Sequence, residues 1–329
     1  MIRVEAHWLY EEGIGENRAA LVEHDEIVEM AIELPGALRL GTVIEGRLTA
    51  ILVPGRRGVV RTDAGEAMLE PLPAQLTEGQ AVRVEIVREP IPERGRPKLA
   101  RCRLTEDALY DGPNLAERIG PHHLVSAAGP DRLEQAGWSE RLEEAASGEI
   151  PFPGGALRMD ITAAMTLFDV DGSLPPAELA VAGAAAAAGA IRRFGIGGSI
   201  GMDLPTLASK AERQRAAEAV DSVLPQPFER TAVNGFGFLQ LVRRRDRPSL
   251  PELLQSDPAG AAARALLRRA ERAPGAGERV LSAAPAVIGR IEANPAWIEA
   301  LARRIGAGIV LQPEPGLAIS AGHVHARFS

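Results

Sequence analysis

The sequence is poor in cysteine, in aromatic residues and in long apolar runs. Its single cysteine, Cys102, excludes an intramolecular disulfide and any metal site built from several cysteines. Phe, Trp and Tyr make up only 4% of the 329 residues, so aliphatic side chains and alanine must build most of the core. A content of 46% hydrophobic and 25% charged residues is that of a globular chain, long enough for two or three domains.

Segments that address a protein to a membrane are also missing. No stretch approaches the roughly 20 apolar residues that a membrane span needs. The first residues lack the basic start and apolar run of a secretory signal. We therefore expect a soluble, cytoplasmic protein without a membrane partner.

The charge distribution is uneven. The net charge of −7 does not indicate a polyanionic ligand for the chain as a whole. Residues 88–103 nevertheless carry a net +4 and residues 228–247 a net +3, which predicts two phosphate-binding surfaces. From charge alone, solvated faces without a ligand are the alternative. The candidate phosphate-binding cations are Arg94, Arg96, Lys98, Arg101, Arg243, Arg244 and Arg245.

The first 104 residues are rich in β-strand patterns. Residues 1–36 contain a hairpin, with strands near 18–22 and 27–33. Residues 37–104 hold several short apolar-polar runs separated by Pro and Gly, which predicts a five-stranded barrel of the OB type. Such barrels bind single-stranded nucleic acid through basic grooves and stacked aromatics. Its central strands offer Val59 and Val60 in place of aromatics, which excludes stacking on those strands.

The rest of the chain mixes helices with strands. Residues 105–150 have helical patterns, with His122 and His123 in a solvated turn. Residues 151–250 alternate strand and helix, which predicts an α/β subdomain. Residues 251–278 are predicted to be a linker helix, and residues 279–329 a small α/β domain. The expected fold class is therefore a multidomain chain of mixed α+β and α/β type.

Two carboxylates follow apolar strands of the α/β segment. Asp169 comes after MTLF and Asp203 after SIGM. The crevice beyond the carboxyl ends of strands is the usual ligand site of open α/β sheets. Paired carboxylates there suit a hard cation such as Mg²⁺, which can polarise a phosphoryl oxygen. Capping a following helix, or pairing with arginine, is the alternative role for each of them.

Three stretches surround these aspartates: IPFPGGALRMDITAAMTLFDVDGS at 150–173, IGGSIGMDL at 196–204 and FGFLQLVRRRDRPSL at 236–250. Together they resemble the core of the ribonuclease E/G endoribonucleases. That family has a Pro-x-Gly-Gly turn, a strand with an Asp, a Thr-Glu-Ala-hydrophobic-Thr segment leading to Ile-Asp-Val-Asn, and later a Gly-Gly-hydrophobic strand that ends in Ile-Asp. The matching positions are Pro153, Gly154, Gly155, Asp160, Thr162, Thr166, Asp169, Gly197, Gly198 and Asp203. A family Arg-Phe-Gly-Leu-hydrophobic-Glu run is echoed by residues 235–240.

The resemblance implies both a domain order and an activity. An OB-type barrel would interrupt an RNase H-like subdomain, and a DNase I-like nuclease subdomain and a small C-terminal domain would follow. Asp169 and Asp203 match the family's metal-binding aspartates and would hold Mg²⁺. The implied reaction is endonucleolytic hydrolysis of single-stranded RNA to 5′-phosphate products, with the basic islands as RNA contacts.

Departures from the family pattern surround the two aspartates. Asp171 replaces an asparagine, which adds a third candidate catalytic carboxylate beside the metal or a group that repels the scissile phosphate. Ala163 replaces the glutamate of the Thr-Glu-Ala segment, and Thr206 replaces a second acid. Two functions therefore stay open: a compact endoribonuclease, and a weakened RNA-binding or regulatory relative.

Other departures concern assembly. The family's zinc-linking cysteines are absent, so we expect no zinc-linked tetramer, while a homodimer stays an open alternative. About 50 residues separate the barrel from the Pro-x-Gly-Gly turn, too few for the family's usual 5′-sensor domain.

Overall fold

The computed structural model describes residues 6–93, 95 and 97–327, and the chain is mixed α/β. The residues described form three open sheets and one closed five-stranded barrel, so the expected fold class and the barrel are confirmed at this level. No helix in the described ranges is long and apolar enough to cross a membrane. Arg94 and Arg96, two of the candidate cations, lie outside the described residues.

A four-stranded sheet, here called the first sheet, has the strand order β3-β2-β1-β9. β9 runs parallel to β1, whereas the other pairs are antiparallel. Its strands are β1 (His7–Glu12), β2 (Asn17–Glu23), β3 (Glu26–Glu33) and β9 (His122–Leu124). The sheet is therefore completed by a strand that follows the barrel in the chain.

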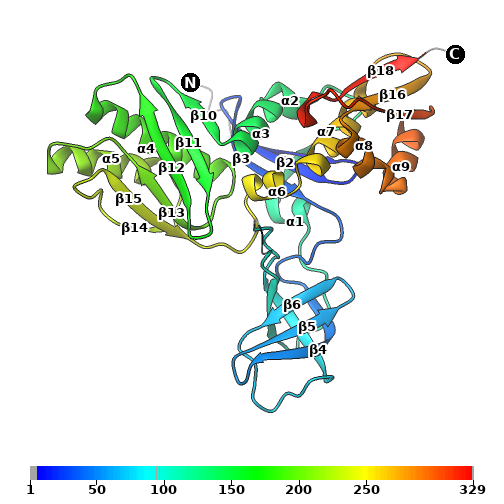
Figure 1. Ribbon diagram of the computed structural model, residues 1–329, viewed down its shortest axis with the longest axis horizontal. Helices are drawn as coiled ribbons and strands as arrows, with labels where there is room; N and C mark the ends of the chain where they lie inside the picture. The colour runs from blue at the N-terminus through cyan, green and yellow to red at the C-terminus, as the bar shows by residue number, and fades with distance from the viewer. Residues whose placement is uncertain (1–5, 94, 96, 328–329) are drawn as a thin grey trace.

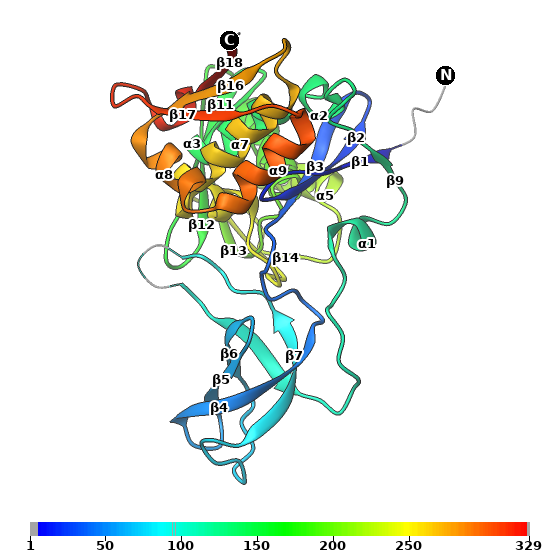
Figure 2. The ribbon, with the colours of Figure 1, turned by 90° about the vertical axis from the view of Figure 1, so that its right-hand side faces the viewer.

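The barrel is inserted between β3 and β9. Its strand order is β4-β5-β6-β8-β7, and β6 and β8 form its one parallel pair among the described strands. Small and aliphatic side chains fill it, including Leu48, Val60 and Cys102, each 0% exposed. The strands are β4 (Val43–Val53), β5 (Arg57–Thr62), β6 (Gly65–Leu69), β7 (Ala81–Arg88) and β8 (Ala100–Leu104). In both ribbon views the barrel projects from the rest of the molecule (Figures 1 and 2).

The segment expected to be helical, residues 105–150, is more broken than the sequence indicates. Its helices are α1 (Leu115–Ile119), α2 (Arg132–Gln135) and α3 (Trp138–Ser147). Gly137, at φ +89°, separates α2 from α3, because this left-handed conformation cannot continue a helix. His122 and His123 lie on β9 and not in a turn, because pairing with β1 draws them into the first sheet.

The largest sheet has six strands in the order β10-β11-β12-β13-β15-β14, with one parallel pair, β12 and β13. Its strands are β10 (Glu149–Phe152), β11 (Gly155–Ile161), β12 (Thr166–Gly172), β13 (Gly198–Asp203), β14 (Glu229–Arg230) and β15 (Phe238–Arg243). Helix α4 (Pro176–Arg193) connects β12 to β13, and α5 (Lys210–Val223) connects β13 to β14. This follows the alternation of strand and helix expected from the sequence.

Helix α4 joins the six-stranded sheet to the first sheet. It packs against β11 and β12 on one side and against β3 on the other. Its alanines at 184, 187 and 188 are fully buried, and such small side chains let both sheets approach the helix closely. One hydrophobic core therefore runs from Leu9 in the first sheet to Phe168 in the six-stranded sheet.

The remaining residues form helices and a small C-terminal sheet with the order β17-β16-β18. Its elements are α6 (Leu250–Ser256), α7 (Pro258–Arg272), β16 (Glu278–Ala283), α8 (Pro285–Glu292), α9 (Pro295–Ile305), β17 (Ile309–Pro313), the 3₁₀ turn η1 (Ile319–Ala321) and β18 (His323–Arg327). The expected single linker helix at 251–278 is two helices, which break at Asp257 before Pro258. They belong to the hydrophobic cores, since Leu254 is 6% exposed and Leu266 is 0% exposed.

A buried cluster of charges holds α7 to the first sheet. Arg18 of β2 is 0% exposed, and its guanidinium contacts Glu11 at 2.5 Å and Asp131 at 2.6 Å. Next to it, Glu16 accepts a hydrogen bond of 2.7 Å from Arg264 of α7. In Figure 1 the first sheet lies between the six-stranded sheet and the C-terminal helices, as this arrangement requires.

Candidate functional site

The two predicted metal-binding aspartates are direct neighbours across the parallel pair of strands. Asp169 of β12 is the register partner of Asp203 of β13. Parallel strands lie about 4.8 Å apart, and register partners point to the same face of a sheet. Phe168 and Met202, the residues before them, are 0% exposed and face the helices. Asp169 and Asp203 therefore share the opposite, exposed face, here called the open face, and Asp171 lies two residues further along it.

The carboxylates of Asp169, Asp171 and Asp203 are exposed, and they make no hydrogen bond or ion pair with any part of the chain that the structure describes. They are thus neither helix caps nor arginine partners, which were the alternatives to a metal-binding role. The described residues contain no group of three or more His, Cys, Asp or Glu arranged to hold an ion. The residues fit a Mg²⁺ ion that takes two carboxylates from the protein and keeps several water ligands.

The other two departures from the resembled motifs lie in the segments that flank the aspartate strands. Ala163 is exposed in the turn between β11 and β12, before the strand that carries Asp169. Thr206 is exposed in the segment after β13. On β11, Arg158 is the register partner of Asp169, yet its Nε lies 3.2 Å from Glu149 Oε1. The open face is consequently acidic next to the two aspartates.

Two aromatic residues lie beside Asp203, and the sequence patterns did not indicate their role. Phe238 of β15 is the register partner of Asp203. Its ring lies over Gly201, where an added Cβ would come within 2.5 Å of Phe238 Cζ. Phe236, in the turn before β15, is 84% exposed. The Asn-Gly pair at 234–235, which is typical of tight turns, is the sequence signal that marks this turn.

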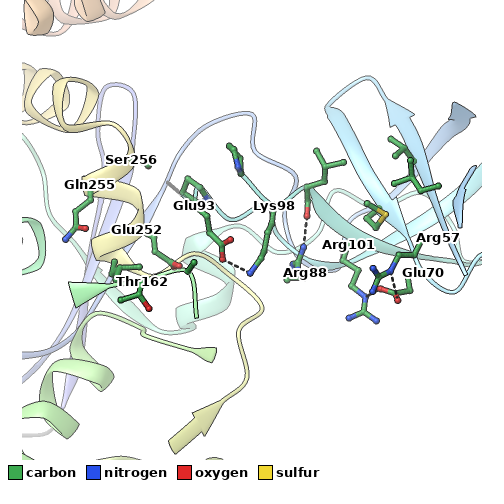
Figure 3. Close-up of a pocket in the computed structure, with 18 residues that line it drawn as sticks. Arg57, Glu70, Arg88, Glu93, Lys98, Arg101, Thr162, Glu252, Gln255 and Ser256 are labelled. Carbon is green, nitrogen blue, oxygen red and sulfur yellow. Dashed lines mark hydrogen bonds and ion pairs between the residues drawn. The ribbon is translucent and has the colours of Figure 1, made fainter. Parts of the chain in front are cut away.

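A second feature is a cavity of about 1050 Å³ between the barrel and the six-stranded sheet. The barrel strands, the connection between β7 and β8, the β11–β12 turn and α6 form its walls. Figure 3 shows Glu93 and Lys98 between the barrel, which carries Arg57 and Arg101, and helix α6, which carries Glu252. Thr162 of the β11–β12 turn lines it too. Asp169 is three residues further along β12 than Thr166, so the carboxylate pair is about 10 Å beyond the start of that strand.

Lys98 and Arg101, the two described candidate cations of residues 88–103, line this cavity. Lys98 Nζ contacts Glu93 Oε1 at 2.5 Å, and Arg101 Nε lies 3.4 Å from Glu70 Oε2. Arg57 shares the Glu70 carboxylate with Arg101, at 3.1 Å. These guanidinium and ammonium groups line the cavity, but acidic side chains already offset most of their charge.

Arg88 differs from its neighbours in the cavity. Its Nη2 donates a hydrogen bond of 2.7 Å to the carbonyl oxygen of Leu99, and no carboxylate in the described part of the chain pairs with it. Burial and the nearby charges of Arg101 and Arg245 lower the pKa of Arg88 below the ordinary value. The carboxylates of Glu93 and Glu70 act on Arg88 without contacting it, and a phosphate entering the cavity would be a direct partner.

The three arginines of the second island occupy different settings. Arg243 is partly buried, and its Nη1 donates to the carbonyl oxygen of Ile196 at 3.4 Å. Arg244 is 75% exposed and pairs with Asp246. Arg245 bridges two parts of the fold, because it pairs with Glu252 of α6 and lies 3.0 Å from Glu93. Of the three, Arg244 is the guanidinium most open to solvent.

Both histidine pairs are on strands. The His122 ring lies tilted against Tyr10 with ring centroids 5.0 Å apart, and His123 meets His7 edge to face at 5.3 Å. His323 and His325 are exposed on β18, with parallel rings 6.2 Å apart.

Sequence comparison with family models and with curated proteins gave no relative. No protein-family model matches the chain, and no curated protein matches its sequence.

Proposed function

We propose that the protein is a Mg²⁺-dependent endoribonuclease that hydrolyses phosphodiester bonds of single-stranded RNA. The observation that carries this proposal is the register pairing of Asp169 with Asp203 on the open face. Two strands fix the backbone positions of the carboxylates before any ligand arrives, and such preorganisation favours a hard cation. Neither carboxylate is engaged by another described side chain, so both are available as ligands.

Asp169 and Asp203 would each give one oxygen to the metal. A bound Mg²⁺ supplies Lewis-acid polarisation of a phosphoryl oxygen and lowers the pKa of an attacking water. The two carboxylates would orient the scissile phosphate by holding its counter-ion in place. Leu167 and the Phe238 ring, next to them on the same face, would limit the water around the site.

The strand orders support the domain identities implied by the family resemblance. The first sheet, with β9 parallel to β1 and the barrel inserted before β9, fits an interrupted RNase H-like subdomain. The barrel order β4-β5-β6-β8-β7 with its parallel β6–β8 pair fits an OB-type fold. The six-stranded sheet would then be the DNase I-like nuclease subdomain.

The cavity beside the barrel is the proposed entry for RNA. Arg88 has no carboxylate partner among the described residues, and Lys98 and Arg101 lie in the same cavity. Phosphates would displace the acidic partners of these cations and release counterions, which makes binding depend on salt. RNA held there lies beside the turn that starts β12.

A second function, RNA binding without efficient hydrolysis, is favoured by one residue. Asp171 is exposed two residues from Asp169 on the open face, where the resembled family has an asparagine. A third carboxylate there repels a phosphate and offers no N–H donor. Ala163 adds to this reading, since the acid of the family's Thr-Glu-Ala segment is missing.

One experiment separates the two functions. Fluorescent AU-rich single-stranded RNA is incubated with Mg²⁺ and either the protein or its Asp169→Asn/Asp203→Asn variant. The endoribonuclease is expected to give 5′-phosphate products, which EDTA and the double substitution both suppress. Equal cleavage by protein and variant would exclude the site. Binding without cleavage, together with cleavage gained in Asp171→Asn, would establish the second function.

A further inference from the structure

Phe236 is the most exposed large hydrophobic side chain in the described part of the chain, at 84%. It sits in the turn between β14 and β15, next to the end of the strand that carries Asp203. Leaving a phenylalanine side chain in water forgoes about 1.5 to 3 kcal/mol of burial. In a chain with only seven phenylalanines, this one is placed beside the carboxylate pair.

The turn that presents Phe236 is held in place. The side-chain oxygen of Asn234 accepts hydrogen bonds from the backbone N–H groups of Phe236, at 2.9 Å, and Phe238, at 3.0 Å. Gly237 has φ +94°, and a Cβ there would lie 2.1 Å from the carbonyl oxygen of Leu204. Leu204 in turn donates its N–H to the Gly237 carbonyl oxygen at 3.2 Å. The backbone of Phe236 is thereby fixed to the residue that follows Asp203.

The charges of the open face limit how RNA can be held there. The exposed carboxylates of this face include those of Asp160, Asp169, Asp171 and Asp203. Arg158, the cation nearest to Asp169 in register, pairs with Glu149. Apart from the metal ion, this surface offers phosphates more repulsion than attraction. An aromatic ring binds a nucleobase by stacking, which needs no positive charge.

We propose that Phe236 is a stacking platform for one nucleobase of single-stranded RNA, next to the phosphate that the Asp169–Asp203 pair addresses. The inference rests on the proposed function and adds a nucleobase-binding subsite to it. The barrel binds phosphates through its cations, and Phe236 holds a base at the carboxylate pair. Because stacking accepts any base, the subsite contributes affinity and position and no strict sequence preference.

The test measures binding without cleavage. A short oligouridine containing one 2-aminopurine is titrated with protein in EDTA, and the fluorescence quenching of the stacked base is recorded. The variants are Phe236→Ala, Phe236→Leu and Phe236→Trp, with Leu124→Ala as the control. Leu124 is 66% exposed on β9, in a different sheet. All variants change an exposed side chain, and circular dichroism confirms that they fold.

Phe236→Ala and Phe236→Leu are expected to weaken binding about 5- to 150-fold and to lose the quenching. Phe236→Trp and Leu124→Ala should bind as the unchanged protein does. The dependence of affinity on salt should keep its slope, since no phosphate contact is lost. Equal affinity for Phe236→Ala, or leucine acting as well as tryptophan, would overturn the proposal. So would a loss of self-association with unchanged RNA binding, which would make Phe236 a protein contact.

The two proposals fail in different ways. If RNA binding depends on Phe236 but the Asp169→Asn/Asp203→Asn variant and the unchanged protein give equal cleavage, the base subsite stands and the endoribonuclease falls. If cleavage requires both aspartates but Phe236→Ala binds RNA normally, the endoribonuclease stands and the base subsite falls.

Discussion

The carboxylate of Glu16, in the connection between β1 and β2, accepts a 2.7 Å hydrogen bond from Arg264 Nε of α7. Arg268, one helical turn further on, contacts the other oxygen of the same carboxylate. All three side chains are at least 94% buried. A single acidic group thus joins two cations of the C-terminal part to the first sheet.

Glu16→Gln is expected to cost about 3 to 5 kcal/mol of unfolding free energy, because it removes the one charge that both buried guanidinium groups contact. Glu45→Gln is the matched control, since Glu45 pairs with Arg83 at 3.0 Å but is 67% exposed. An exposed pair contributes only about 0.2 to 1 kcal/mol. Urea unfolding followed by tryptophan fluorescence measures both. Similar losses for the two variants would contradict the role given to Glu16.

The buried cluster also predicts how stability depends on pH. Burial alone would raise the pKa of Asp131, but the charge and hydrogen bond of Arg18 and the N–H of Glu134 hold it below its ordinary 3.8. A carboxyl whose pKa is depressed in the folded state contributes stability above its unfolded pKa, and this contribution is lost as the pH falls through the folded value.

The variant for this test is Asp131→Asn, which keeps a side-chain oxygen for the α2 cap and removes the charge. The protein should be more stable than the variant by a constant margin from about pH 7 to pH 5. Below about pH 4 the margin should shrink. A margin that persists at the lowest pH at which the protein stays folded would show that the Asp131 charge is not its source.

Two glycines with the same backbone angle predict different costs of substitution. Gly15 and Gly36 both have φ +79°. An added Cβ at Gly15 would lie 2.6 Å from Trp297 Cε2, whereas nothing lies within 4 Å at Gly36. Both alanine variants pay roughly 1 to 2 kcal/mol for the left-handed conformation. Because of the clash with Trp297, Gly15→Ala should lower the melting temperature more than Gly36→Ala does and should also shift the tryptophan emission. Equal melting temperatures and emission spectra for the two variants would contradict this prediction.

Neighbouring arginines should differ in their effect on the position of the barrel. Arg245→Ala removes the bridge between Glu93 and α6, so we expect a loss of about 1.5 to 3 kcal/mol and a larger radius of gyration in small-angle scattering. Arg244→Ala removes a 75% exposed group paired locally with Asp246, and it should stay within about 0.5 kcal/mol of the unchanged protein. Unchanged scattering in Arg245→Ala would mean that other contacts hold the barrel.

The single cysteine gives a direct probe of the barrel. Burial raises the pKa of Cys102 to about 12. At about pH 8 the thiolate fraction is then on the order of one in ten thousand, and the closed barrel shields the sulfur. The native protein should resist a thiol-reactive dye, and guanidinium-unfolded protein should react at once. Rapid labelling of native protein would show that the barrel opens.

The sequence predicts those parts of the fold that repeat locally. The alternating patterns within residues 37–104 predicted the barrel, and the apolar runs before Asp169 and Asp203 located two strands. Asp203 ends β13 as expected, whereas Asp169 lies inside β12, which continues to Gly172 because pairing with β11 extends that far. The adjacency of the two aspartates followed only once their strands were paired. Their shared face depends on register, and a shift of one residue would have placed one carboxylate in the core.

Features set by distant contacts left no such pattern. β9 is three residues long, and it is a strand because β1 lies beside it. Arg245 belongs to a basic run, yet carboxylates from two other segments pair with it. The apolar side chain of Phe236 favours a place in the core, but the turn that Asn234 stabilises exposes it to water.

The insertion of the barrel before β9 affects the order in which the protein can fold during synthesis. A ribosome releases β1, β2 and β3 first, but the strand that completes their sheet emerges only after the whole barrel. The barrel holds all five of its strands in one continuous stretch and can close on its own. During synthesis β1 therefore keeps an unpaired edge until β9 emerges. The barrel, which is synthesised after β1, β2 and β3, can complete its fold before their sheet does.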